Sequence, residues 1–142
     1  MKRIAAIALF VAASFITAGG ALAQDQKVKA TVPFNFTVNS SSLPAGNYTI
    51  GSDSTSRNIL TIADWDKHVH ILAMGQTDSG TSVKSGHLVF HKYGDQYFLS
   101  EICYAGSATT VQFPASKAER RAKAETQEAG LRIENDVMVA LY

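Results

Sequence analysis

The sequence is poor in the residue types that usually reveal a protein's chemistry. Its 142 residues include a single cysteine, Cys103, so no disulfide can form within the chain. The neighbours Ile102 and Tyr104 favour a buried thiol. Lys and Arg number 13 against 12 Asp and Glu, and this balance gives no general electrostatic attraction to nucleic acid. We therefore expect neither a disulfide scaffold nor a nucleic-acid-binding protein.

Motifs of catalysis and of cofactor binding are missing as well. The sequence has no G-x-S-x-G or S-x-x-K nucleophile motif and no glycine-rich phosphate loop. We therefore expect no catalytic residue and no cofactor. Whether the protein is an enzyme stays open at this point, although the pattern favours a protein without catalytic activity.

Long apolar runs are absent except near the start of the chain. Residues 4–16 form an apolar run of 13 residues, short of the roughly 20 that a helix needs to cross a membrane. Lys2 and Arg3 precede the run, and an A-L-A triplet at 21–23 has the small-x-small pattern that signal peptidase requires. Residues 1–23 therefore predict a cleavable signal peptide, with cleavage near Ala23 and delivery to the periplasm or the exterior of a bacterial cell.

The remainder, residues 24–142, has the length of a single domain. Cleavage removes two basic residues and no acidic one, so the net charge changes from +1 to −1. No second apolar run follows, and we expect a protein that is not integral to the membrane after cleavage.

Alternating polar and apolar residues dominate this domain. The clearest case is residues 27–39, where one face carries Val, Ala and Phe and the other carries Lys, Thr and Asn. Pro33 interrupts it and indicates an edge position or a bulge, since proline cannot donate to a ladder. Gly94-Asp95 forms a two-residue connection of the kind found in tight hairpins. About eight segments have strand character: 27–39, 47–50, 59–63, 68–74, 86–93, 96–104, 109–113 and 131–142.

One helix is expected, at about 117–129. Ser116 and Glu119 form a capping box at its start, in which each side chain accepts a hydrogen bond from a backbone N–H. Gly130 stands where a helix-ending glycine belongs. The helix has no apolar side larger than alanine, so we expect it on the surface. The fold class predicted is all-β and mainly antiparallel, a small sandwich or barrel with one short surface helix; residues 40–42 and 75–82 are expected to be loops.

Histidines are the candidate metal ligands. His68 and His70 share the predicted strand 68–74, and His87 and His91 share the strand 86–93. Two imidazoles two residues apart on a strand can bind one metal ion, and a neighbouring strand could supply a third. No carboxylate at a diagnostic spacing completes such a set, and spacing alone favours solvent-facing histidines on a sheet.

Asp64 and Asp66 flank Trp65 in a predicted hairpin turn. Two carboxylates could bind a cation or act as acid and base. The turn itself is the favoured explanation, because Asp side chains bond nearby backbone N–H groups. Trp65 would be of interest if exposed, since a lone aromatic at a turn can anchor a sugar or a partner.

Three motifs carry a resemblance: V-P-F-N-F at 32–36, L-P-A-G-N-Y-T at 43–49 and F-H-K-Y-G-D-Q-Y-F-L-S at 90–100. They resemble a group of small exported proteins of environmental bacteria, over most of residues 28–121. The resemblance implies one exported domain, and it assigns no catalytic or binding residue.

These observations favour a non-catalytic exported β domain that binds a partner or is associated with the cell envelope. The alternative is a small metal-binding protein or enzyme that uses the strand histidines. A homo-oligomer is a third possibility, formed through the edge strand that contains Pro33 or through the tail at 131–142. The sequence identifies no partner.

Overall fold

The computed structural model describes residues 27–52, 56–133 and 136–142. These residues form eleven strands and one helix. The predicted signal peptide lies outside the described residues, as does most of the polar segment at 53–56.

The first sheet has four antiparallel strands. Its strands are β1 (Lys27–Val32), β4 (Gly46–Ser52), β5 (Ile59–Asp64) and β6 (Val69–Met74), in the order β1-β4-β5-β6. Strand β6 is therefore an edge strand, with β5 as its one neighbour among the described residues.

The second sheet has seven strands. Five follow the order β11-β8-β9-β10-β7, and the β2–β3 hairpin joins β9 through one parallel pair, Thr37 with Phe98. The strands are β2 (Phe36–Val38), β3 (Ser41–Leu43), β7 (Gln76–Ser79), β8 (His87–Tyr93), β9 (Gln96–Cys103), β10 (Thr109–Gln112) and β11 (Val137–Ala140).

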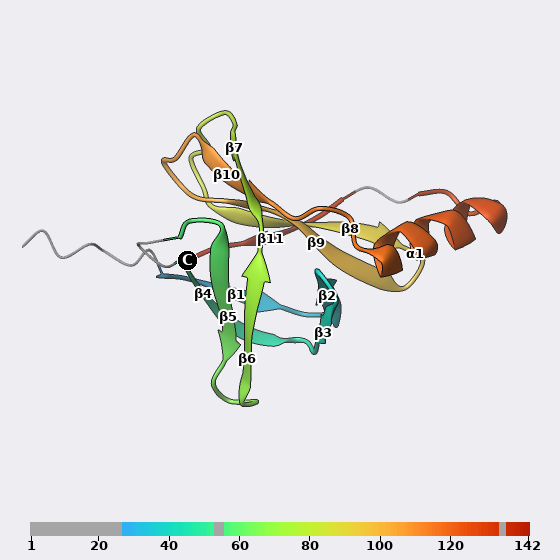
Figure 1. Cartoon of the computed structure of the whole chain (residues 1–142), viewed down its shortest axis with the longest axis horizontal. Coiled ribbons are helices and arrows are strands. Elements are labelled where there is room, and N and C mark those ends of the chain that lie inside the picture. The colour runs from blue at the N-terminus through green and yellow to red at the C-terminus, as the bar shows by residue number, and fades with distance from the viewer. Residues whose placement is uncertain (1–26, 53–55, 134–135) are drawn as a thin grey trace, which may run out of the picture.

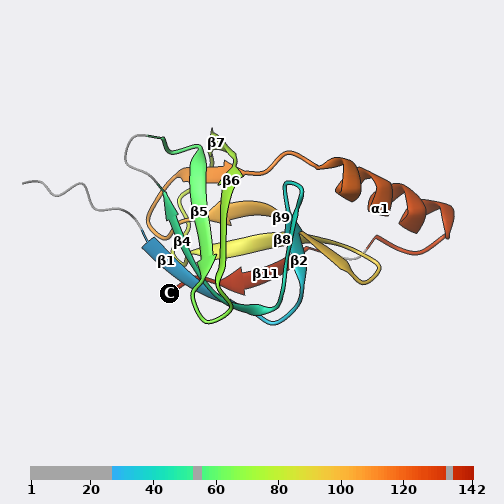
Figure 2. The same cartoon turned by 60° about the horizontal axis from the view of Figure 1, so that its bottom comes forward.

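The two sheets pack into a small β-sandwich, seen from two directions in Figures 1 and 2. The predicted alternation explains the core: Ala30, Val32, Phe36 and Val38 are buried, whereas the residues between them are exposed or half-buried. Tyr48, Leu60, Ile62 and Phe90 join them in one apolar cluster. The all-β, mainly antiparallel fold is confirmed, and of the two predicted architectures the structure has the sandwich.

Three strands were not predicted as separate elements. The strand expected at 27–39 is divided at Pro33, because its first part belongs to one sheet and its second part to the other. β3 lies mostly in the loop predicted at 40–42 and ends at Leu43, and β7 lies in the loop predicted at 75–82. All four side chains of β7 are exposed, so its sequence carries no apolar alternation; backbone pairing with β10 makes it a strand.

The chain turns from the first sheet into the second at Gly75, between β6 and β7. A Cβ atom at this position would overlap the side chain of Val111, so the close approach requires glycine. A second connection lies at the opposite edge, where the backbones of Lys29 and Tyr142 exchange two hydrogen bonds of 2.9 and 3.0 Å. The end of the chain thereby covers the edge of β1, and β11 pairs with β8.

The predicted hairpin turn at Gly94-Asp95, the Ser116 cap and the helix-ending Gly130 are confirmed. Gly94-Asp95 closes the β8–β9 hairpin, with Gly94 at a φ of 59°. Helix α1 (Lys117–Glu128) begins after Ser116, whose hydroxyl accepts the N–H of Glu119 at 3.1 Å. Gly130 ends the helix at a φ of 66°. Within the described residues, the one helix is too short and too polar to span a membrane.

Candidate functional site

The four histidines do not converge. His68 lies in the turn after β5, at a φ of 54°, rather than in a strand as predicted. The turn places His68 in the left-handed backbone conformation, so β6 begins one residue later, at Val69. His70 lies on β6 of the first sheet, whereas His87 and His91 lie on β8 of the second. Among the described residues, no group of three or more His, Cys, Asp or Glu side chains is arranged to hold a metal ion.

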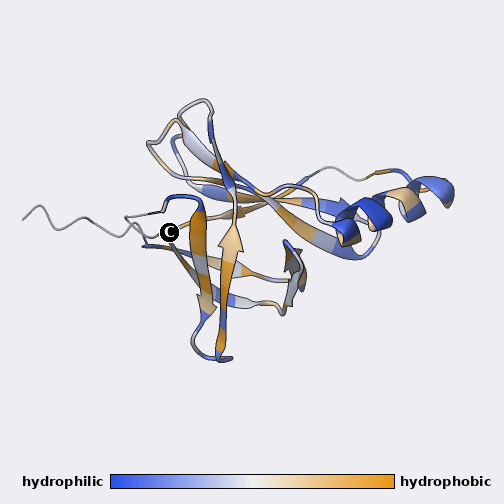
Figure 3. Cartoon of the chain, in the orientation of Figure 1, coloured by the Kyte–Doolittle hydropathy of each residue, from blue (hydrophilic) through white to orange (hydrophobic). Residues whose placement is uncertain are grey.

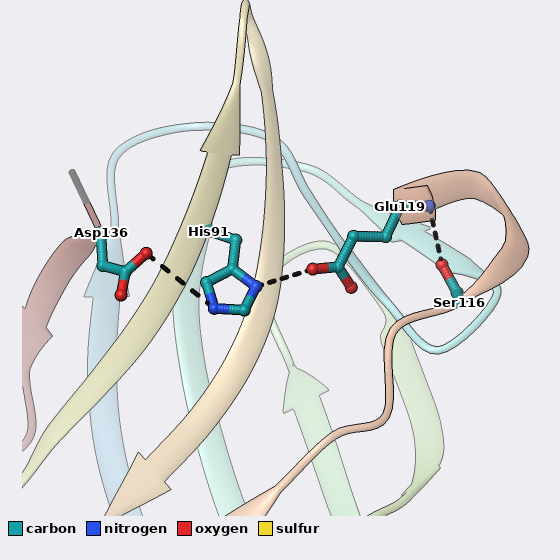
Figure 4. A network of polar contacts seen from close by, with 4 residues as sticks. All are labelled: His91, Ser116, Glu119 and Asp136. Carbon is teal, nitrogen blue, oxygen red and sulfur yellow. Dashed lines mark hydrogen bonds and ion pairs between the residues drawn. The ribbon is translucent and has the colours of Figure 1, made fainter. Parts of the chain in front are cut away.

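His91 is instead the centre of a small polar cluster (Figure 4). Its Nδ1 lies 2.7 Å from Oε1 of Glu119 on α1, and its Nε2 lies 3.9 Å from Oδ1 of Asp136, just before β11. Glu119 is buried, with 5% of its surface exposed. One imidazole therefore connects β8 to the helix and to the segment that leads into the last strand.

The cluster also affects a neighbouring phenol. Burial, followed by the negative charges of Glu119 and Asp136, raises the pKa of Tyr93. The Ser116 hydroxyl accepts a hydrogen bond from the backbone N–H of Glu119 at the helix start. The contacts of His91 with Glu119 and Asp136 link the helix and the segment before β11 to the sheet.

The predicted capping box is half correct. Ser116 caps the helix as expected, but the Glu119 carboxylate contacts His91. A charged hydrogen bond to a partner on the sheet replaces the local one to the helix start. Ala122 is the helix's apolar contact, in a small cluster with Tyr93 and Phe98.

Asp64 organises two turns, and this accounts for the Leu-Pro-Ala-Gly motif. Its Oδ1 accepts the N–H groups of Asp66 at 3.0 Å and Lys67 at 3.2 Å, as the turn explanation predicts. Lys67 Nζ donates to the carbonyl of Ala45. A Cβ atom at Gly46 would overlap Oδ2 of Asp64, so the glycine leaves room for the buried carboxylate.

Two further buried groups, the Cys103 thiol and the Tyr104 hydroxyl, hold their protons at neutral pH. Burial, together with the charge of Glu101 and a hydrogen bond to its side chain, raises the pKa of Cys103 to about 11. The thiol is therefore protonated and unreactive at neutral pH, as its apolar neighbours indicated. The Tyr104 hydroxyl is buried and has no hydrogen-bond partner within the described part of the chain, and burial raises its pKa to about 12.

Among the residues that the structure describes, the largest concentration of exposed large apolar side chains lies on the β5–β6 hairpin. Trp65, at the turn, is 72% exposed, and Leu72 and Met74 on β6 are 65% and 67% exposed. Ile59 faces Met74 across the two strands. The Trp65 ring lies 6.5 Å from that of His70, which shares the outward side of β6 with Leu72 and Met74. We call this set the β5–β6 face: Ile59, Trp65, His70, Leu72 and Met74.

Figure 3 shows the contrast along the chain: β5 and β6 are largely hydrophobic, whereas α1 is largely hydrophilic. Exposed large apolar side chains on neighbouring positions of a sheet are characteristic of surfaces that bind partners. The sequence indicated Trp65 as a candidate but gave no sign of Leu72 and Met74, since both belong to an apolar run that could equally have been core. Glu119 and Asp136 were also missed, because only the fold brings them to His91.

No protein family model, curated protein or solved structure that was compared with the chain matches it.

Proposed function

We propose that the chain is exported and works as a non-catalytic binding domain through the β5–β6 face. One observation carries the proposal: Trp65, Leu72 and Met74 are each about two-thirds exposed or more on a single hairpin. Placing them in water forgoes on the order of 1.5–3 kcal/mol of burial free energy per large apolar side chain. A binding partner that covers them would recover part of this free energy.

The remaining polar clusters support a binding role over catalysis. Asp64 is engaged by two backbone N–H groups, and His91 is engaged by Glu119. Each of these side chains holds elements of the fold together.

The binding part of the proposal can be tested with 8-anilinonaphthalene-1-sulfonate, an anionic dye whose aromatic rings bind exposed apolar surface. Trp65 is the only tryptophan of the chain, so energy transfer from its indole reports dye bound near it, and substitutions on the face show whether the dye binds there. We expect transfer in dilute native protein and its loss in Leu72→Gln, a neutral change that adds no cation to attract the sulfonate. Met138→Gln is the matched control, because Met138 is 67% exposed on β11, in the other sheet. Dye binding without transfer, or equal transfer in all three proteins, would contradict the proposal.

Export is tested separately. The A-L-A triplet at 21–23 predicts a mature protein that begins at Gln24. Mass spectrometry of the protein recovered from a bacterial periplasm should give the mass of residues 24–142. Recovery of the full-length mass from the cytoplasm would reject this part.

A further inference from the structure

The free edge of β6 has a definite hydrogen-bonding pattern. The Gly75 N–H donates to the carbonyl of Asn58 at 2.8 Å, which makes residues 58 and 75 a hydrogen-bonded pair. Hydrogen-bonded and non-hydrogen-bonded pairs alternate in an antiparallel ladder, so Ala73 and Ile71 also point their backbone groups toward β5. The backbone groups of His70, Leu72 and Met74 consequently point away from the sheet.

A side-chain contact supports this assignment. The Asn39 amide donates to the Met74 carbonyl at 3.2 Å, which places that carbonyl on the free edge. The N–H and C=O groups of His70 and Leu72 remain as the central groups to which another strand could bind.

Strand β6 differs in charge from the outer strands β1 and β7, whereas the outer strand β11 is uncharged like β6. The edge of β1 carries Lys27 and Lys29 and is paired with the end of the chain. The edge strand β7 is wholly polar and includes Asp78. β6 has the sequence V-H-I-L-A-M, without lysine, acid or proline, the residues that natural proteins use to block edge pairing. The near-zero net charge of the chain also gives little repulsion between two copies.

We propose that the occupant of this edge is a second copy of the same chain, with the two β6 strands paired antiparallel about a two-fold axis at Ile71. This inference rests on the proposed function, since it names the partner of the β5–β6 face. A two-fold axis at Ile71 places His70 opposite Leu72 of the second copy, and Leu72 opposite its His70. Both residues on each side have free backbone groups, so four inter-chain hydrogen bonds form. The two sheets then continue into one sheet of eight strands.

The register of the two paired β6 strands follows from which backbone N–H and C=O groups are free. A two-fold axis at Leu72 would require the Met74 carbonyl, which already accepts from Asn39. The axis at Ile71 leaves that contact intact. It also brings Leu72 beside His70 of the second copy, and because the Trp65 ring lies 6.5 Å from that of His70, the apolar side chains of both faces become neighbours.

The expected affinity is modest. A six-residue strand is about 20 Å long, so strand pairing covers only part of the roughly 800 Å² per partner that stable interfaces bury. Contacts between Leu72 and the Trp65–His70 pair of the other copy add to it. We therefore expect a dimer that dissociates on dilution.

Cysteine cross-linking tests the register directly. Ile71 would face Ile71 of the second copy as a non-hydrogen-bonded pair, with Cα atoms about 4.5 Å apart, which suits a disulfide. We expect Ile71→Cys to form a disulfide-linked dimer in concentrated protein without reductant. His70→Cys is the matched control, since residue 70 faces residue 72 of the other copy. The wild-type protein should not cross-link, because Cys103 is buried.

Sedimentation velocity provides a second measurement that does not depend on the Ile71 variant. The average mass of the full chain should rise toward that of a dimer as its concentration increases, and Leu72→Lys should abolish the rise while Met138→Lys preserves it. A chain that stays monomeric, an Ile71→Cys protein that cross-links no faster than His70→Cys, or a Leu72→Lys protein that dimerises like the wild type would each overturn the dimer. Monomers that still show Trp65-to-dye transfer reject the dimer and leave the proposed function standing, whereas monomers without transfer reject both.

Discussion

Asp64 shows how one buried carboxylate can define two turns that are far apart in the sequence. The residue is 1% exposed, and its Oδ1 accepts two N–H groups of its own turn. Its other oxygen, Oδ2, points at Gly46 of the Pro44–Gly46 turn. The sequence was sufficient to predict the local role of Asp64, because Asx turns depend on nearby residues. The need for glycine at 46 depends on a contact between two strands and could not be predicted.

Buried Tyr48 and half-buried Tyr104 should respond differently to loss of their hydroxyl. The Tyr48 hydroxyl donates to the Pro44 carbonyl, whereas the buried Tyr104 hydroxyl has no hydrogen-bond partner among the described residues. We expect Tyr48→Phe to lower the free energy of unfolding by about 1 kcal/mol, because the Pro44 carbonyl loses its donor. Tyr104→Phe should be neutral or stabilising, because it removes a buried polar atom that gains nothing. Urea denaturation at neutral pH measures both; a large loss in Tyr104→Phe would contradict the assignment.

The same tyrosines predict how stability depends on pH. Burial raises the pKa of each phenol to about 12, above the ordinary value of 10.0; in Tyr48 the charge of Asp64 contributes as well. The folded state therefore holds protons that the unfolded state releases between pH 10 and 12. This contribution is complete below pH 10, and stability falls as the pH rises through the interval. Repeating the denaturation in that range should show a shallower fall for Tyr104→Phe than for the wild type.

The attachment of helix α1 to the sheet depends largely on the contact between Glu119 and His91. Its buried residues are Glu119, Ala122 and Thr126, which offer little apolar area. The sequence predicted the helix, its start and its end because caps and propensity are local. It could not predict the partner of Glu119, since His91 is 28 residues away along the chain.

Loss of the His91 imidazole should therefore loosen the helix. We expect His91→Ala to lower the free energy of unfolding by about 1–3 kcal/mol, because a buried carboxylate loses its hydrogen-bond donor. The exposed pair of Arg121 and Glu125, 2.7 Å apart on the same helix, is the control. Arg121→Ala should change stability by less than about 0.5 kcal/mol. Equal effects of the two substitutions, measured by chemical denaturation, would show that the His91 contact does not fasten the helix.

At the scale of the whole molecule, the last residues of the chain pair with the outer edge of β1. Tyr142 exchanges two backbone hydrogen bonds with Lys29, and Leu141 donates to the Gly86 carbonyl at 2.9 Å. The tail and the Pro33 edge were candidate surfaces for self-association in the sequence. The structure pairs β1 with the end of the chain and β11 with β8, so the tail is used within the chain.

Removal of Leu141 and Tyr142 should consequently open this edge. We expect truncation after Ala140 to lower the free energy of unfolding on the order of 3 kcal/mol, from three backbone hydrogen bonds and the packing of Leu141. Tyr142→Phe, which removes only the hydroxyl contact with Thr31 at 2.8 Å, should lose at most about 1 kcal/mol. A truncated protein as stable as the wild type would mean that the hydrogen bonds and packing of Leu141 and Tyr142 contribute nothing to stability.

At this scale the sequence predicted the sheet content well and the arrangement of edges poorly. Alternation identifies strands with one buried face, such as β1 and β4. It does not identify β7, whose four residues are all exposed, nor which strand has an open edge. The candidate surface on β6 depends on that missing information, because among the described residues nothing covers the outward side of the strand, where Leu72 and Met74 lie.

Amide hydrogen exchange resolved by residue tests most directly whether β6 is an open binding edge. In dilute protein, the N–H groups of His70 and Leu72 should exchange much faster than those of Ile71 and Ala73, which donate to β5. Raising the protein concentration should slow exchange at His70 and Leu72 alone. Equal protection of all four amides in dilute protein would contradict the account, because it would mean that the edge of β6 is already covered.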